Sequence, residues 1–83
     1  MPEALYQRFV KEQIGERELD YALFILGKYE STYPNSFYLP LYKADIKLLQ
    51  GDFMEAKKLY QSLKEKGLEN DNLDRILKNL EDE

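Results

Sequence analysis

The side chains of this chain that could carry acid–base or metal chemistry are its carboxylates, because there are 16 aspartates and glutamates but no histidine and no cysteine. Histidine is the commonest general base and transition-metal ligand, and thiolate chemistry needs cysteine. The densest carboxylate cluster, ENDNLD at 69–74, lacks the central glycine and the final bidentate glutamate of a calcium loop. We therefore predict a protein that is not an enzyme and that holds no metal and no cofactor.

The other side chains that could do chemistry are polar and aromatic groups suited to binding a protein partner. Tyrosine combines rigid contact area with a hydrogen-bonding tip, and lysine attracts acidic side chains or a chain terminus. One side of the first expected helix carries Gln7, Arg8 and Lys11. One side of the third carries Tyr38, Tyr42 and Asp45. For Tyr38 and Tyr42, packing in the core is as well supported as exposure to a partner, and both alternatives stay open.

The composition is that of an ordinary soluble chain, with 43% hydrophobic and 34% charged residues, and residues 1–83 are expected to form one domain. The net charge of −4, with lysines scattered among glutamates, gives no basic stripe for nucleic acid. The longest apolar run, Ala22 to Leu26, is too short to cross a bilayer, and the first residues, MPE, lack the basic start and apolar run expected of a signal peptide. We expect a cytoplasmic protein without membrane insertion, or a periplasmic or envelope-associated one if the sequence is trimmed from a longer parent.

The elements that must position these side chains are five helices, with no strand. The spacing of apolar residues predicts helices at about 2–15, 17–33, 37–50, 53–66 and 71–83. Glycines at 15, 51 and 67 mark helix ends. The expected N-caps are Asn35 or Ser36 for the third helix, Asp52 for the fourth, and Asp71 or Asn72 for the fifth.

One helix pattern occurs twice, at a separation of about 34 residues that we call the repeat period, with Ala56 repeating Ala22. This period and the residues around it resemble the tetratricopeptide repeat (TPR). The residues at the family's positions are Tyr6, Phe9, Val10, Ala22 and Pro34 in the first repeat, and Gly51, Phe53, Ala56 and Tyr60 in the second. In such a unit the alanine is small because the two helices cross closely there.

The resemblance implies an all-α fold: a right-handed superhelical stack of two TPR-like helix-turn-helix units plus a capping helix. The expected parts are repeat one at about 3–36, repeat two at about 37–70 and the capping helix at about 71–83. The second repeat departs from the family, because Lys43 and Lys47 fall at apolar positions and Leu68 replaces the closing proline. Its hydrophobic wheel favours a different set for the core: Leu41, Ala44 and Leu48.

The resemblance also implies a protein–protein interaction module or scaffold that binds a partner peptide or helix in a concave groove. The two groups of polar and aromatic residues above would line that groove. One alternative is a self-associating element, a homodimer through Tyr21 and Phe24, which fall beside Leu23 on the convex side of the second helix. Another is a docking module of a larger parent protein, with the last helix as the docking surface.

Overall fold

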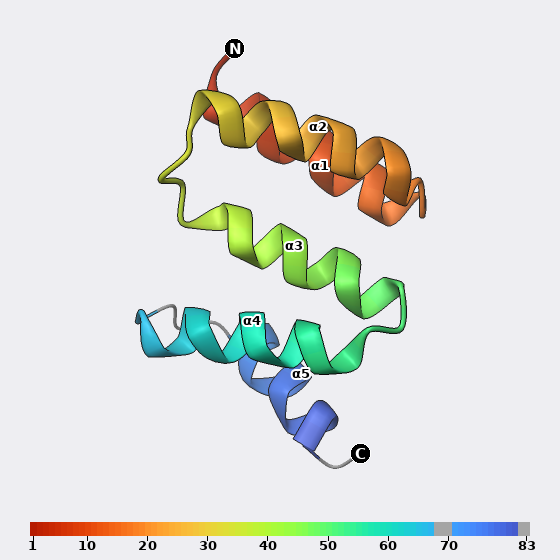
Figure 1. Ribbon diagram of the computed structural model, residues 1–83, viewed down its shortest axis with the longest axis vertical. Helices are drawn as coiled ribbons and strands as arrows, with labels where there is room; N and C mark the ends of the chain where they lie inside the picture. Colours follow the sequence, from red (N-terminus) through yellow and green to blue (C-terminus); the bar gives the residue numbers. More distant parts are fainter. Residues whose placement is uncertain (68–70, 82–83) are drawn as a thin grey trace.

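The computed structural model describes residues 1–67 and 71–81, and in these residues it contains five α-helices and no strand (Figure 1). The helices are α1 (Glu3–Gly15), α2 (Leu19–Thr32), α3 (Tyr38–Leu49), α4 (Phe53–Glu65) and α5 (Asp71–Glu81). The all-helical prediction is confirmed. The predictions made for Leu68, Asp71 and Asn72 concern residues or side chains outside the described part of the chain.

Single residues fix the turn between α3 and α4, as predicted. Gly51 has a φ of +83°, a left-handed conformation that glycine adopts without a Cβ penalty. Asp52 is the N-cap of α4, where its Oδ1 accepts a hydrogen bond from the backbone N–H of Glu55 at 3.3 Å. Arg17, which lies one repeat period before Gly51, is also left-handed, with a φ of 64°. The turns inside the two helix pairs therefore share a left-handed residue at the equivalent position.

The start of α3 agrees only in part with the prediction that Asn35 or Ser36 caps it. The N-cap is Phe37, whose own side chain makes no capping hydrogen bond. Ser36 Oγ accepts a hydrogen bond from the backbone N–H of Tyr38 at 3.4 Å, and its hydroxyl donates to Glu3 Oε2 at 2.5 Å. The side chain of Ser36 therefore contacts the first turn of α3, as predicted, and also forms a tertiary hydrogen bond.

The helices pair as α1 with α2 and α3 with α4, and α3 also lies against both helices of the first pair (Figure 1). Each pair buries one small residue on each helix completely: Val10 and Ala22 in the first pair, Ala44 and Ala56 in the second. The residues of the second pair follow those of the first by one repeat period. The complete burial of both predicted alanines is what a close helix crossing requires.

Two hydrophobic clusters fill the molecule, and α3 belongs to both. The first cluster joins α1, α2 and α3 and consists of Val10, Ala22, Leu26, Tyr29, Leu39, Tyr42 and Ile46. The second joins α3, α4 and α5 and consists of Ala44, Ala56, Tyr60, Leu63, Leu73 and Leu77. Leu41 and Leu48 pack against the second cluster, so the hydrophobic wheel predicted for the third helix is confirmed.

An ion pair crosses each junction between a helix pair and the helix that follows it. Glu30 of α2 pairs with Lys43 of α3 at 2.5 Å, and Lys64 of α4 pairs with Asp74 of α5 at 3.0 Å. Glu30 and Lys64 are again separated by one repeat period. The second helix of each pair therefore forms an ion pair with the next helix from the same position. The residue at that position is acidic in the first pair and basic in the second.

Candidate partner-binding surfaces

The predicted binding residues of α1 and α3 include one pair of opposite charges at equivalent positions. Lys11 on α1 and Asp45 on α3 occupy equivalent positions, one repeat period apart, and the charge of Lys11 acts on the Asp45 carboxylate. Burial raises the pKa of Asp45, while a hydrogen bond from Tyr60 and the charge of Lys11 both act to lower it. We call the surface between these two helices the α1–α3 face, and its predicted residues are Gln7, Arg8, Lys11, Tyr38 and Asp45.

Two residues of the α1–α3 face are engaged inside the molecule. The hydroxyl of Tyr60, on a fully buried ring, donates to Asp45 Oδ1 at 2.5 Å. Gln7 Nε2 donates to the hydroxyl of Tyr29, which is also fully buried, at 3.3 Å. Asp45 and Gln7 therefore each satisfy a buried phenol, a structural role that competes with binding a partner.

The other three residues of this face are exposed. Arg8 pairs with Glu12 on its own helix at 3.4 Å, and both side chains are more than half exposed. Lys11 is exposed, and Tyr38 is 43% exposed. Lys11 and Tyr38 are therefore the residues of the α1–α3 face that a partner can reach most directly.

Tyr42 belongs to the core, so the structure supports the packing alternative for this residue. Its side chain is only 2% exposed, and burial raises its pKa to about 12. Its ring centroid lies 6.4 Å from those of both Tyr29 and Tyr38. Among the described residues, nothing forms a hydrogen bond with its buried hydroxyl. Tyr42 therefore does not line a surface that a partner could contact.

A hydrogen-bond network at the start of α1 was not predicted from the sequence. Glu3 Oε2 accepts from the Tyr29 hydroxyl at 2.6 Å and from the Ser36 hydroxyl at 2.5 Å. The hydrogen bond from Ser36, followed by that from Tyr29, holds the pKa of Glu3 below its ordinary value of 4.5. Glu3 is 26 residues from Tyr29 and 33 from Ser36, so no local pattern could have indicated the network. It fastens the first turn of α1 to α2 and to the loop before α3.

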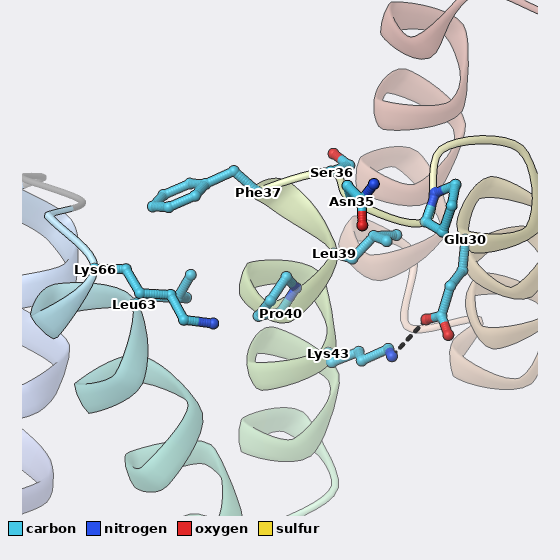
Figure 2. A pocket seen from close by; sticks show the side chains of 10 residues that line it. Glu30, Asn35, Ser36, Phe37, Leu39, Pro40, Lys43, Leu63 and Lys66 are labelled. Atoms are coloured by element: carbon cyan, nitrogen blue, oxygen red, sulfur yellow. Dashed lines mark ion pairs between the residues drawn. The ribbon is translucent and has the colours of Figure 1, made fainter.

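A hollowed surface lies on the other side of α3 (Figure 2). Lys43 is two residues from Asp45, or about 200° around the helix, and lines two adjoining cavities of about 380 and 420 Å³. Both cavities are also lined by Glu30 and Pro34, so the Glu30–Lys43 ion pair stands where they meet. We call this surface the α2–α3 groove, and its other lining residues include Leu23, Gly27, Ser36, Phe37, Pro40 and Lys66.

The α2–α3 groove is open because, within residues 1–67, α2 and α4 do not pack against each other although both pack against α3. One side of α3 is left as the floor between them. Phe37, 40% exposed, and Pro40 stand at the end nearest the loop (Figure 2). In the sequence, Lys43 departs from an apolar pattern, and its pairing with Glu30 across the groove accounts for a charge at that position.

The predicted patch on α2 is exposed, but it is divided between two sides of the helix. Tyr21 is 55% exposed and Phe24 59% exposed, and their ring centroids are 6.1 Å apart. Lys28 Nζ lies 5.1 Å from the centre of the Phe24 ring, a cation–π contact. Leu23 lines the α2–α3 groove and is therefore separate from the two aromatic residues.

No family model, no curated protein sequence and no solved structure matches this chain. Within 1–67 and 71–81, no helix combines the length and the apolar character needed to span a membrane. The described residues also contain no cluster of three or more acidic side chains placed to hold a metal ion.

Proposed function

We propose that this chain is a protein-interaction module, built as a right-handed superhelical stack of two TPR-like helix pairs with α5 as the cap. Equivalences over one repeat period support this arrangement: Ala22 and Ala56 are both fully buried, and Glu30 and Lys64 both reach the next helix. Stacked helical repeats present extended surfaces to segments of other proteins. A module of this kind holds a partner by shape and side-chain contacts.

The observation that carries the proposal is the α2–α3 groove. Its two cavities, about 380 and 420 Å³, fall in the range of about 300–1,000 Å³ that is usual for binding pockets. Leu23 and Phe37 supply apolar wall, one in each cavity, and the Glu30–Lys43 pair supplies polar groups between them. This pattern suits an extended peptide that places one apolar side chain in each cavity and its polar backbone across the ion pair.

A second candidate site is the α1–α3 face, which is favoured by the exposed Lys11 and Tyr38. It offers a cation and a ring that stacks on Tyr42, with interplanar angle 25°. Its other polar groups are less free to bind, because Gln7 and Asp45 already bond to buried tyrosines. The geometry therefore favours the α2–α3 groove as the main site.

The proposal is tested by selecting a random peptide library on the immobilised full chain and then mapping the selected peptide on the labelled chain by NMR. The expected result is enrichment of peptides with two apolar residues, with shifts in the amide signals of Gly27, Phe37 and Lys43. Shifts centred on Lys11 and Tyr38 would move the site to the α1–α3 face. Failure to enrich any peptide that binds the folded chain would count against the proposed function.

A pair of neighbouring substitutions sharpens this test. Leu23→Glu places a charge in one cavity, so it should weaken binding of the selected peptide by about tenfold or more. Phe24→Glu is the matched control, because Phe24 is exposed on the same helix and is not among the residues that line the groove. Equal affinity of the Leu23→Glu variant and the unmodified chain would place binding elsewhere. Circular dichroism confirms that both variants are folded before they are compared.

A further inference from the structure

The side of α1 that faces away from α3 carries apolar residues. Gln7 bonds to the hydroxyl of Tyr29, whose ring centroid lies 6.4 Å from that of Tyr42 on α3, so the Gln7 side of α1 is the side toward the first cluster. Phe9 is two residues from Gln7, about 200° around the helix, and is therefore on the opposite side. Leu5 is one turn before Phe9 on that same side. These two side chains are 37% and 39% exposed, respectively, large fractions for apolar groups of this size.

The same argument places the aromatic residues of α2. Glu30 faces α3, because it pairs with Lys43. Tyr21 and Lys28 precede Glu30 by nine and two residues, rotations of about 180° and 200° around the helix, so both point away from α3. The hydroxyl of Tyr6 bonds to Thr32 along this edge and joins the two helices there. We call the resulting surface the end face, and its residues are Leu5, Phe9, Tyr21, Phe24 and Lys28.

The end face corresponds to a buried surface in the second helix pair. Leu39 follows Leu5 by one repeat period and is 4% exposed, because it packs into the first cluster. Tyr42 and Ile46, at the positions equivalent to Arg8 and Glu12, are buried there too. The equivalent side of the second helix pair is thus covered by the first pair, α1 and α2.

We propose that the end face binds the end face of a second copy of this chain, related by a two-fold axis. Stacking of copies head to tail would need the opposite, outer side of the second pair, but α5 occupies it and buries Leu73 and Leu77 there. A face-to-face contact is then the arrangement open to two copies, and it closes at a dimer. The proposal is independent of peptide binding, because the α2–α3 groove lies on the other edge of α2.

The charges at the rim of the end face fit such a two-fold contact. Arg8 and Glu12 are one turn apart on α1, at the border between Lys11 of the α1–α3 face and the apolar residues Leu5 and Phe9. They pair within their own helix at 3.4 Å. When two copies of a helix pack antiparallel, an arginine and a glutamate spaced in this way can each face the opposite charge of the other copy. This part of the rim is therefore self-complementary, and it places polar groups beside the apolar centre, as in other separable interfaces.

Sedimentation equilibrium of the full chain over a wide range of concentrations tests the proposal. The expected result is a reversible monomer–dimer equilibrium with no larger species. Phe24→Glu should weaken dimerisation by about tenfold or more, because it places a charge in the apolar face. Leu23→Glu, on the groove edge of the same helix, is the control and should leave dimerisation unchanged. A chain that stays monomeric at the highest concentration, or Phe24→Glu behaving like the unmodified chain, would overturn the proposal.

A mixing experiment separates pairing between copies from pairing within a helix. Arg8→Glu leaves only acidic groups at the two rim positions, and Glu12→Arg leaves only basic ones. Each variant alone should dimerise several-fold more weakly than the unmodified chain, because like charges face each other across the axis. An equimolar mixture should form the mixed dimer and recover the lost affinity. If mixing recovers nothing, Arg8 and Glu12 do not pair between copies and the two-fold arrangement is wrong.

Discussion

Tyr42 and Tyr60 are both buried phenols, but among the described residues only Tyr60 has a hydrogen-bond partner. The Tyr60 hydroxyl donates to Asp45, and burial together with that carboxylate raises the pKa of Tyr60. An unpaired buried hydroxyl costs about 1–3 kcal/mol, whereas a hydrogen bond to a charged group contributes about 1.5–3 kcal/mol. Two chemically identical deletions should therefore have opposite effects on stability.

Removing the hydroxyl of Tyr42 should leave the chain as stable as before or stabilise it by about 1 kcal/mol, because it deletes an unpaired buried group. Tyr60→Phe should destabilise the fold by about 1.5–3 kcal/mol, because Asp45 loses its donor. Urea unfolding of Tyr42→Phe and Tyr60→Phe measures both free energies, with Tyr38→Phe as an exposed control. A loss from Tyr42→Phe as large as that from Tyr60→Phe would mean that the Tyr42 hydroxyl is bonded in solution.

The network around Glu3 makes a prediction about pH. Hydrogen bonds from Ser36 and Tyr29 lower the pKa of Glu3 below 4.5, so the folded state favours the ionised carboxylate. Its contribution to stability is present above pH 4.5 and is lost as the pH falls through the lower, folded-state pKa. Glu3→Gln should therefore melt at a lower temperature than the unmodified chain at pH 7, and the difference should shrink as the pH falls below 4.5 through the folded-state pKa.

Differential scanning calorimetry at several pH values measures this difference directly. Asp45, whose pKa is raised, responds to pH in the opposite direction, but it is present in both proteins and cancels in the comparison. Glu65→Gln is a suitable control, because Glu65 is exposed on α4 and lies outside the end face. A difference in melting temperature that is the same at every pH would show that the Glu3 carboxylate is not what the network stabilises.

At the scale of helices and turns, the sequence predicts most of what the structure shows, because local chemistry decides it. Gly51 and Asp52 end one helix and begin the next for reasons contained in those two residues. The start of α3 was predicted only in part: Ser36 accepts from the backbone N–H of Tyr38, but its hydrogen bond to Glu3, which is far away in the sequence, was not predicted. The α2–α3 groove was not predicted either, because it depends on how α2, α3 and α4 are spaced and no local pattern sets that spacing.

Two glycines provide a test of the turn and helix assignments. Gly51 is left-handed in a turn and Gly27 lies inside α2, and a Cβ added at either would meet nothing within 4 Å. The two sites therefore differ in backbone conformation, which is left-handed at Gly51 and α-helical at Gly27. Gly51→Ala should destabilise the chain by about 1–2 kcal/mol, and Gly27→Ala should stabilise it by about 1 kcal/mol. Thermal unfolding of the two variants measures the contrast, and effects of the same sign would contradict the assigned backbone conformations.

At the scale of the whole molecule, α3 decides whether the two helix pairs behave as one unit. Its residues alternate between the two clusters: Tyr42 and Ile46 pack with the first pair, and Ala44 packs with α4 and α5. Unfolding of α3 would therefore expose apolar surface in both clusters. We therefore expect one cooperative unfolding transition, although the two clusters share no buried residue.

Overpacking at one point tests this cooperativity. Ala56 is fully buried in the second cluster, so Ala56→Leu should push α4 away from α3 and destabilise the chain by about 1–3 kcal/mol. Because α3 belongs to both clusters, the slowest-exchanging amides of α1 and α2 should lose the same free energy of protection as those of α4. Native-state hydrogen exchange measures this residue by residue, with Met54→Leu, at a residue 76% exposed on the same helix, as the control. Loss of protection confined to α3, α4 and α5 would show that the first helix pair folds without the second.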